Sequence, residues 1–328
     1  MFNKAKLKFD DIFENRLSED EVREYLIELY KKGETANEIA AAASAMREHM
    51  IPLNLPFELQ DKLIDNCGTG GDKSNSFNIS TTVSILLSAC GSYVAKHGNR
   101  SITSKSGSAD MLEALGIDLN LSFENQAIMM EKTGFIFMFA QNHHPAMKHI
   151  MPIRKSLDHR TIFNILGPLS NPAGVKKQLI GVFDKDYISK IVEALKIMGT
   201  KNAMVVSSKD GMDEISICDI TYASILECDS VKEMIIDPRE YGFNLAKKED
   251  IIGGDAKDNA KITRGILEGT ITDAKRDIVL LNTAAALLVD GKVSNIQEGI
   301  DMAKDVILTN KASQKLNEII KISNELSS

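Results

Sequence analysis

From about residue 61, short apolar runs alternate with stretches whose apolar residues recur at helical spacing. The apolar runs are "KLID" (62–65), "GSYVAKHG" (91–98), "FIFMFA" (135–140), "QLIGVF" (178–183) and "NAMVVSS" (202–208). Between the first two runs, Ile79, Val83, Leu86 and Cys90 have the spacing of one helical face. Strands alternating with helices are typical of an α/β sheet covered by helices. We therefore predict a central, mostly parallel sheet flanked by helices.

The first fifty residues have a different, purely helical pattern. Ser18 with Glu21 and Thr35 with Glu38 show the spacing of a capping box, in which the two residues satisfy each other's backbone N–H groups. The second of these helices is rich in alanine and should end before Pro52, because proline breaks the helical hydrogen-bond ladder. This part of the chain is predicted to form a small helical bundle.

The chain has 328 residues, which exceeds the size at which a single hydrophobic core usually stops growing. We expect a helical domain of residues 1–61 and an α/β domain of residues 62–328. Helices from about 143–172 are predicted to complete the helical domain, because that stretch lacks strand alternation. Near the C-terminus, Ser294 and Gln297 are expected to cap one further helix.

Composition excludes several classes of protein. The formal net charge is −7, which argues against a general polyanion binder, so any phosphate site must be local. The four cysteines show no CxxC spacing, which indicates reduced thiols and a cytoplasmic protein. We expect no targeting segment and no membrane span, because the best apolar stretch, "IVLLNTAAALLV", is too short.

The stretch "DNCGTGGDKSNSFNIST" (65–81) places a glycine-rich loop between a strand and a helix that should begin near Ile79. Ser80 or Thr81 is expected to cap that helix. Glycines let backbone N–H groups approach phosphate oxygens, and a helix N-terminus is electropositive. The loop is therefore predicted to bind an anion, although a simple tight turn would have the same composition. It matches neither a Walker A loop nor a Rossmann fingerprint.

A second polar segment, "AKHGNRSITSKSGSAD" (95–110), follows the next strand. It gathers Lys96, His97, Arg100 and Lys105 among glycines and hydroxyl groups, a composition suited to phosphate. A solvated basic loop is the alternative interpretation. Two such loops at the ends of neighbouring parallel strands would face the same crevice, which favours the binding role.

Two adjacent acids, Asp213 and Glu214, follow the strand "NAMVVSS" and a glycine turn. Acid pairs in loops are usually only solvated. Beside two anion-binding loops, however, this pair could hold a Mg²⁺ ion that bridges diphosphate oxygens.

The segment "HHPAMKHIMPIRK" contains three histidines and an arginine. The spacing of His143, His144 and His149 matches no zinc signature, so a structural or substrate-lining role is the better interpretation. Arg154 lies in an apolar neighbourhood, where a guanidinium group would suit a carboxylate. Residue chemistry alone thus indicates a Mg²⁺-dependent enzyme acting on a diphosphate, and it does not name the reaction.

Several of these motifs occur together in one known family. They are "GTGGD", "NIST", "KHGNR", "SGSADMLEALG", "HHPAMKH", "RTIFNILGPLSNPA" and "GMDEIS". In this combination the chain resembles, over nearly its whole length, the anthranilate phosphoribosyltransferases of tryptophan biosynthesis. The resemblance implies a small helical domain, a larger α/β domain and a homodimer formed through the helical domain. It also implies Mg²⁺-dependent transfer of a phosphoribosyl group from 5-phosphoribosyl 1-diphosphate to anthranilate, with release of diphosphate.

The resemblance also implies roles for individual residues. Donor-binding positions would be Gly68, Gly71, Asp72, Ser76, Asn78, Ile79, Ser80, Thr81, Lys96, His97, Gly98, Asn99, Arg100, Ser101, Ile102, Thr103, Ser104 and Ser108. Anthranilate-binding positions would be Gly68, Asn99, His144, Arg154 and Gly167, and metal-binding positions Ser80, Asp213 and Glu214. His97 is the candidate catalytic residue, through substrate positioning more than as a strong base, since an aryl amine is already unprotonated at neutral pH.

One departure from the family pattern concerns Ser207, which stands where a histidine often precedes the acidic turn. Three alternatives remain open. A pyrimidine nucleoside phosphorylase would use inorganic phosphate without Mg²⁺, and a relative could use another aromatic acceptor. A noncatalytic nucleic-acid-binding relative would need a basic groove, which the net charge disfavours.

Overall fold

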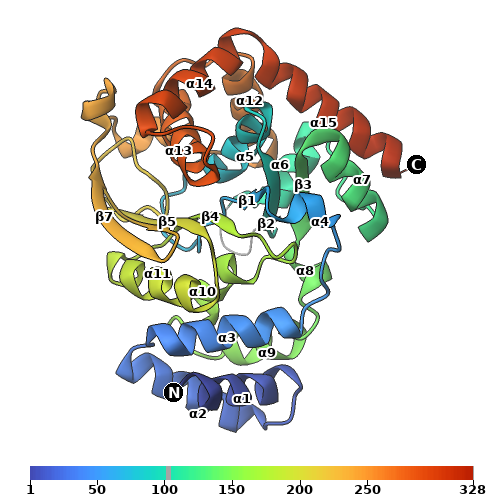
Figure 1. The fold of residues 1–328 in the computed structure, drawn as a ribbon, viewed down its shortest axis with the longest axis vertical. Helices are drawn as coiled ribbons and strands as arrows, with labels where there is room; N and C mark the ends of the chain where they lie inside the picture. Colours follow the sequence, from blue (N-terminus) through green and yellow to red (C-terminus); the bar gives the residue numbers. More distant parts are fainter. Residues whose placement is uncertain (101–104, 328) are drawn as a thin grey trace.

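A seven-stranded sheet forms the centre of the molecule (Figure 1). The computed structural model describes residues 1–100 and 105–327. The strands are β1 (Leu63–Asp65), β2 (Tyr93–Gly98), β3 (Phe135–Phe139), β4 (Lys177–Gly181), β5 (Asn202–Ser208), β6 (Thr221–Glu227) and β7 (Ser230–Ile236), in the order β3-β2-β1-β4-β5-β6-β7. Strands β1 to β5 are parallel, and each lies within or next to one of the predicted apolar runs. The predicted mostly parallel sheet is therefore confirmed.

Strands β6 and β7 extend the sheet as an antiparallel hairpin, which the sequence pattern does not predict. Its turn residues, Cys228 and Asp229, both have left-handed backbone angles, with φ of 45° and 69°. Such turns usually contain glycine or asparagine, and this one lacks that signal. The outer strand β7 is largely exposed, so its side chains show little hydrophobic patterning.

Helices cover both faces of the sheet (Figure 1). On one face α5 and α13 pack near the central strands, and on the other α11 packs against β5 and β6. These helices are α4 (Phe57–Gln60), α5 (Ile79–Ala89), α6 (Ser108–Leu115), α7 (Phe123–Thr133), α8 (Ala140–His143), α11 (Ile188–Ile197), α12 (Ala256–Leu267), α13 (Ala274–Asp290), α14 (Ile296–Leu308) and α15 (Lys311–Ser327). Short 3-10 helices are η1 (Pro168–Ser170), η2 (Lys185–Tyr187), η3 (Pro238–Tyr241) and η4 (Lys248–Ile251).

The remaining helices form a group below the sheet in Figure 1, which we call the helical unit. They are α1 (Phe2–Phe13), α2 (Glu19–Lys32), α3 (Ala36–Glu48), α9 (Met147–Lys155) and α10 (Phe163–Leu166). Helix α9 contacts α1 and α2, and α10 contacts α3. Their core is continuous with apolar residues of α11 and of β4 and β5, so burial of one shared surface fixes the helical unit against the sheet.

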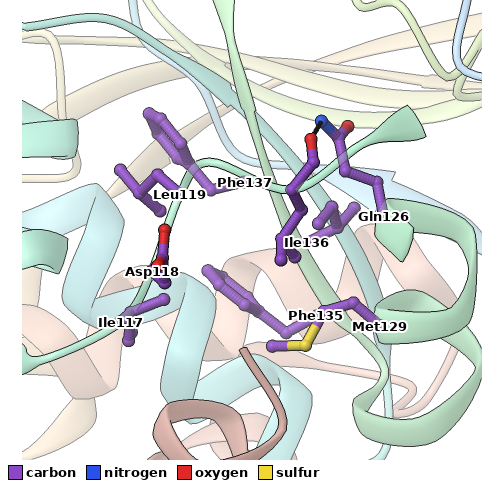
Figure 2. Close-up of a pocket in the computed structure, with 9 residues that line it drawn as sticks. Ile117, Asp118, Leu119, Gln126, Met129, Phe135, Ile136 and Phe137 are labelled. Carbon is purple, nitrogen blue, oxygen red and sulfur yellow. Dashed lines mark hydrogen bonds between the residues drawn. The ribbon is translucent and has the colours of Figure 1, made fainter. Parts of the chain in front are cut away.

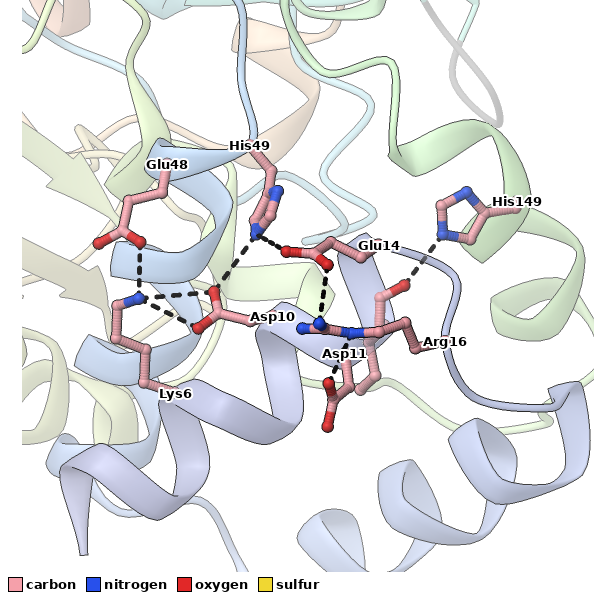
Figure 3. Close-up of polar contacts among 9 residues, drawn as sticks. Lys6, Asp10, Asp11, Glu14, Arg16, Glu48, His49 and His149 are labelled. Carbon is pink, nitrogen blue, oxygen red and sulfur yellow. Dashed lines mark hydrogen bonds and ion pairs between the residues drawn. The ribbon is translucent and has the colours of Figure 1, made fainter.

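Polar contacts also tie the helical unit together (Figure 3). Lys6 of α1 contacts Asp10 at 3.1 Å and Glu48 of α3 at 2.6 Å. His149 of α9 contacts the Ile12 carbonyl oxygen through Nε2 at 3.0 Å. Ion pairs this close to solvent add little stability, so the network orients the helices more than it holds them.

Two predicted capping boxes are confirmed and two other caps were wrong. The boxes at the starts of α2 and α3 form as expected. Helix α14 is capped by Asn295, whose Oδ1 accepts the Glu298 N–H, and Ser294 instead donates its N–H to the Glu298 carboxylate. Helix α5 has Asn78 at its N-cap, so Ser80 and Thr81 lie inside its first turn.

Candidate active site

Three loops meet at the carboxyl edge of the sheet. The glycine loop (66–78) follows β1, the basic loop follows β2 and is described at residues 99–100 and 105–107, and the acidic turn (209–214) follows β5. Strand β1 pairs in parallel with both β2 and β4, and β4 pairs with β5, so all these strands end at one edge. The chain passes from β1 to β2, its neighbour on one side, and β4 is the neighbour of β1 on the other side. Ligands of open α/β sheets bind at such a switch point.

Hydrogen bonds join the glycine loop to the acidic turn and to the end of β4. The Gly70 N–H donates to Asp213 Oδ2 at 2.6 Å, and the Thr69 N–H donates to the Gly181 carbonyl oxygen at 2.9 Å. A Cβ atom on Gly68 would lie 2.5 Å from Asp213 Oδ2, and one on Gly181 would lie 1.6 Å from the Asp213 carbonyl oxygen. Both positions therefore need glycine for the acidic turn to reach the loop.

The carboxylates of this site repel one another. Burial, with the nearby Asp72, raises the pKa of Asp213 to about 7. Burial and Asp213 raise the pKa of Glu214, while Lys96 and the Ser80 backbone N–H act in the opposite direction. Clustered carboxylate oxygens of this kind suit a divalent cation such as Mg²⁺. No three acid, histidine or cysteine side chains among residues 1–100 and 105–327 enclose a metal, so water and substrate oxygens would complete its coordination.

Lys96 brings a positive charge to the same place. Its side chain is 1% exposed, and Nζ donates to Ser80 Oγ at 3.3 Å and to the Asn66 carbonyl oxygen at 3.4 Å. Ser80 lies in the first turn of α5, whose N-terminus is electropositive. Lysine, helix end and acid pair thus converge, which is an arrangement suited to a metal-bound diphosphate.

A neutral histidine pair lies beside these groups. The rings of His97 and His144 are 5.1 Å apart, and burial lowers the pKa of His97 to about 3 and that of His144 to about 4. Nδ1 of His97 lies 3.2 Å from the Gly167 carbonyl oxygen, which assigns the proton to Nδ1. The two Nε2 atoms are buried and have no hydrogen-bond partner among the described residues. Unpaired buried acceptors of this kind point to a ligand.

Asp65 and Asn171, which the sequence reasoning did not identify, hold the Gly167 segment at this place. Asn171 Nδ2 donates to Asp65 Oδ2 and to the Ala95 carbonyl oxygen, both at 2.8 Å. Asp65 is fully buried at the end of β1, and burial raises its pKa to about 6. The "DNC" and "SNP" stretches do not predict this contact, because Asp65 and Asn171 are about a hundred residues apart in the sequence.

Arg154 presents a guanidinium group without an acid partner in the described part of the chain. The group lies over the Phe163 ring, 5.7 Å from its centroid, and Nη1 contacts Met151 Sδ at 3.5 Å. Burial lowers the pKa of Arg154, since no nearby anion offsets the loss of water. An unpaired, half-buried guanidinium is suited to a carboxylate ligand.

Arg100 differs from the other predicted donor-binding residues. Its guanidinium pairs with Asp110 at 2.9 Å and with Glu113 at 2.6 Å, so its charge is already balanced. Asn99 accepts the Arg100 N–H through its side chain. The predicted residues Ser101, Ile102, Thr103 and Ser104 lie outside the described residues. Gly98 and Ser108 pack together: a Cβ on Gly98 would be 3.3 Å from that of Ser108.

A residue missed at the sequence level organises the first turn of α5. Asn259 of α12 donates from Nδ2 to Asn78 Oδ1 at 2.8 Å and accepts the Gly254 N–H at 2.8 Å. Asn78 in turn donates to the Ser106 carbonyl oxygen. Of the other predicted donor-binding residues, Ile79 and Thr81 are buried in α5, and Ser76 accepts a hydrogen bond from Ser74 at 3.1 Å. No local motif marks Asn259.

Other notable side chains lie outside the three loops. His143 contacts the Ile51 carbonyl oxygen at 2.8 Å, and with His149 bound to α1 the three histidines do not form a metal site. Ser207 is buried within β5, opposite Tyr222 of β6. A small pocket of about 10 Å³ lies beside Phe135 (Figure 2), with room for at most one water molecule.

Comparison with known proteins assigns the family. Residues 60–313 match the model "Glycosyl transferase family, a/b domain", and residues 4–50 match "Glycosyl transferase family, helical bundle domain". Anthranilate phosphoribosyltransferase of Listeria monocytogenes is 45% identical over 96% of this chain and 92% of its own length. The chain belongs to the anthranilate phosphoribosyltransferase family.

Other members of this family support the assignment. The enzyme of a Thermoanaerobacter species is 48% identical over 92% of this chain and 88% of its own length. The crystal structure of the Thermus thermophilus enzyme superposes with a TM-score of 0.92, at 34% identity over 99% of this chain and 96% of the other. A Saccharomyces cerevisiae structure in complex with PRPP and Mg has a TM-score of 0.86, at 27% identity over 99% of this chain and 93% of the other. Another from that yeast contains 4-fluoroanthranilate.

None of the helices within the described residues has the length and apolar character required to cross a membrane.

Proposed function

We propose that the chain transfers the phosphoribosyl group of 5-phosphoribosyl 1-diphosphate to the amine of anthranilate, in tryptophan biosynthesis. The products are N-(5-phosphoribosyl)anthranilate and diphosphate. The observation that carries the proposal is the meeting of the acidic turn with the glycine loop, where Asp213 Oδ2 lies 2.6 Å from the Gly70 nitrogen. The relatives of this family that contain PRPP, Mg or 4-fluoroanthranilate support the same reaction.

The donor side of the site is assigned to the glycine loop, the first turn of α5 and Lys96. Backbone N–H groups of the loop and the helix end suit phosphate oxygens. Lys96 would offset the negative charge that develops on the diphosphate as its bond to ribose C1 breaks. The side chain already lies 3.3 Å from Ser80 Oγ, so little rearrangement is needed.

Mg²⁺ is the cofactor of the reaction, and we assign it to Asp213, Glu214 and Ser80. Burial and mutual repulsion raise the pKa values of the two acids, and a bound cation would relieve both effects. When bound, Mg²⁺ supplies positive charge to the diphosphate leaving group. Asp72 adds a further carboxylate at the same edge of the site.

The acceptor side is assigned to Arg154, His97, His144, Asn99, Gly68 and Gly167. Arg154 would pair with the anthranilate carboxylate, because its guanidinium has no acid partner among the described residues. Neutral His97 has an unpaired Nε2 lone pair that can accept a hydrogen bond from the amine, since Nδ1 donates to the Gly167 carbonyl oxygen. The amine nitrogen attacks ribose C1 and afterwards loses one proton. Positioning of the amine, more than proton abstraction, supplies the rate enhancement.

The wider organisation is also part of the proposal. We assign residues 1–61, with helices from about 143–172, to a helical domain and residues 62–328 to the α/β domain; the contacts of α9 with α1 and α2 support this division. We propose a homodimer formed through the helical domain. A cytoplasmic location is supported by the four cysteines, all of which are free thiols.

Product analysis tests the proposed function. Purified protein, 5-phosphoribosyl 1-diphosphate, anthranilate and Mg²⁺ are incubated together, and the products are measured by mass spectrometry. We expect N-(5-phosphoribosyl)anthranilate and diphosphate in equal amounts. The matched control replaces the substrates with a pyrimidine nucleoside and inorganic phosphate. Phosphorolysis in the control, with no transfer to anthranilate, would refute the proposal and favour a nucleoside phosphorylase.

A further inference from the structure

We propose that Arg160 is a positioning residue that holds the glycine loop in its binding shape, an inference that rests on the proposed function of that loop. Arg160 Nη2 donates to the Gly71 carbonyl oxygen at 2.5 Å. The guanidinium carbon lies 3.6 Å from the centre of the Phe183 ring, which is a stacked contact. Arg160 precedes α10 and Phe183 follows β4, so neither belongs to the glycine loop.

The glycine loop benefits from contacts outside itself because several of its residues have backbone angles that are costly to fix. Gly70 and Gly71 have φ angles of 68° and 78°, and Lys73 and Asn75 have 60° and 54°. Glycine loses more conformational entropy on ordering than any other residue, and left-handed angles are unfavourable for lysine. If the loop were not ordered beforehand, each binding of the donor would include the entropic cost of ordering it, and the affinity would be lower.

Two hydrogen bonds to other parts of the chain hold the loop near Gly70 and Gly71. In the first, the Gly70 N–H contacts Asp213, a residue assigned above to the metal site. In the second, the Gly71 carbonyl oxygen accepts the hydrogen bond from Arg160. Apart from Gly71, the second contact involves no residue that we assign to donor binding or to metal binding. Arg160 can therefore hold the loop whether or not Asp213 is engaged by another ligand.

Arg160 is itself fixed in place by its neighbours. Its planar guanidinium stacks on Phe183, which restricts the rotamer, and it donates to the Gly71 carbonyl oxygen. The adjacent His159 stacks on Tyr30 of α2, with ring centroids 3.9 Å apart. A continuous set of contacts thus runs from the helical unit to the Gly71 carbonyl oxygen.

Limited proteolysis gives a readout of loop order that does not depend on turnover. Lys73 is exposed in the loop, so trypsin cleavage of the Lys73–Ser74 bond, followed by mass spectrometry, reports loop opening. In Arg160→Ala we expect cleavage about three- to ten-fold faster than in the wild-type protein. The variant loses the exposed guanidinium that stacks on Phe183, so the loop opens more often. Phe183→Leu should change the rate in the same direction. Arg239→Ala, which removes an exposed arginine paired with Asp237, is the matched control and should leave it unchanged.

Steady-state kinetics separates positioning from a general structural role. Arg160→Ala should raise KM for 5-phosphoribosyl 1-diphosphate about three- to ten-fold, because loop ordering then opposes donor binding. KM for anthranilate and kcat should stay within about two-fold of the wild-type values. The melting temperature should stay within a few degrees of that of the wild type. Arg160→Lys should show most of the same increase in KM for 5-phosphoribosyl 1-diphosphate, since lysine cannot stack a planar group on Phe183.

Wild-type cleavage at Lys73 in the Arg160→Ala protein would overturn the proposal, whatever happens to KM. A rise in both Michaelis constants together would also overturn it. If the wild-type protein shows no phosphoribosyl transfer while the Arg160→Ala loop is cleaved faster, the proposed function fails and the positioning role stands.

Discussion

Replacement of Arg154 by alanine tests the assignment of the acceptor site. The guanidinium has no acid partner among the described residues, so its removal leaves no buried anion uncompensated in the free protein. Its contact with the Phe163 ring contributes about 0.5–1 kcal/mol to stability at most. A charge-assisted hydrogen bond to a carboxylate contributes about 1.5–3 kcal/mol. Loss of one such bond should lower kcat/KM for anthranilate about 10- to 100-fold.

The assay follows the loss of anthranilate fluorescence while one substrate is varied and the other is held at saturation. KM for 5-phosphoribosyl 1-diphosphate should change less than about two-fold in Arg154→Ala. Arg154→Lys should recover part of the activity, since it keeps the charge but loses the planar fork. Arg16→Ala, which removes an exposed arginine from the same helical unit, is the matched control and should behave as wild type.

A second acceptor separates carboxylate recognition from any general damage to the site. Aniline has the amine of anthranilate without its carboxylate, so Arg154→Ala should not lower turnover of aniline relative to wild type. An equal loss with both acceptors, or an equal effect on KM for both substrates, would refute the assignment of Arg154.

The remaining predictions concern the metal site, the glycine loop and acid stability. Asp213→Asn with Glu214→Gln should raise the Mg²⁺ concentration needed for half-maximal turnover; full activity at limiting Mg²⁺ would exclude the metal role. Gly68→Ala should lower kcat/KM at least about ten-fold with little change in melting temperature, because its Cβ would lie 2.5 Å from Asp213 Oδ2; wild-type kinetics would contradict this packing. His97 and His144 stay neutral when folded, whereas in the unfolded chain they take up protons below pH 6.5. Each histidine should therefore lower the free energy of unfolding by about 2 kcal/mol between about pH 7 and pH 5, while the raised pKa values of Asp65, Asp213 and Glu214 contribute in the opposite direction. Urea titrations of the wild type and of a variant with both histidines replaced by Gln isolate the histidine contribution as the difference between their pH slopes; equal slopes would contradict the burial argument.

Much of the fold was predictable from local patterns. Strands β1 to β5 are buried on both faces and appear as continuous apolar runs, and the boxes at Thr35 and Ser18 need only residues three apart. The hairpin of β6 and β7 was not predictable, because β7 is exposed and its turn contains no glycine. Local signals thus sufficed wherever burial or capping involved neighbours in sequence.

The candidate site divides in the same way. The glycine loop and the acid pair follow strands directly, so their meeting at one sheet edge follows from parallel topology. The contacts made by Asn259, Asn171 and Arg160 could not be predicted, because each joins segments that are close only in the folded chain. These three residues orient the loops that the motifs identify.

The most direct test of the central claim is a continuous measurement of anthranilate fluorescence with the purified wild-type protein. We predict a decay that requires protein, 5-phosphoribosyl 1-diphosphate and Mg²⁺ together, with one diphosphate released for each anthranilate consumed. A steady signal in the complete mixture, with the donor shown to bind, would contradict anthranilate as the acceptor.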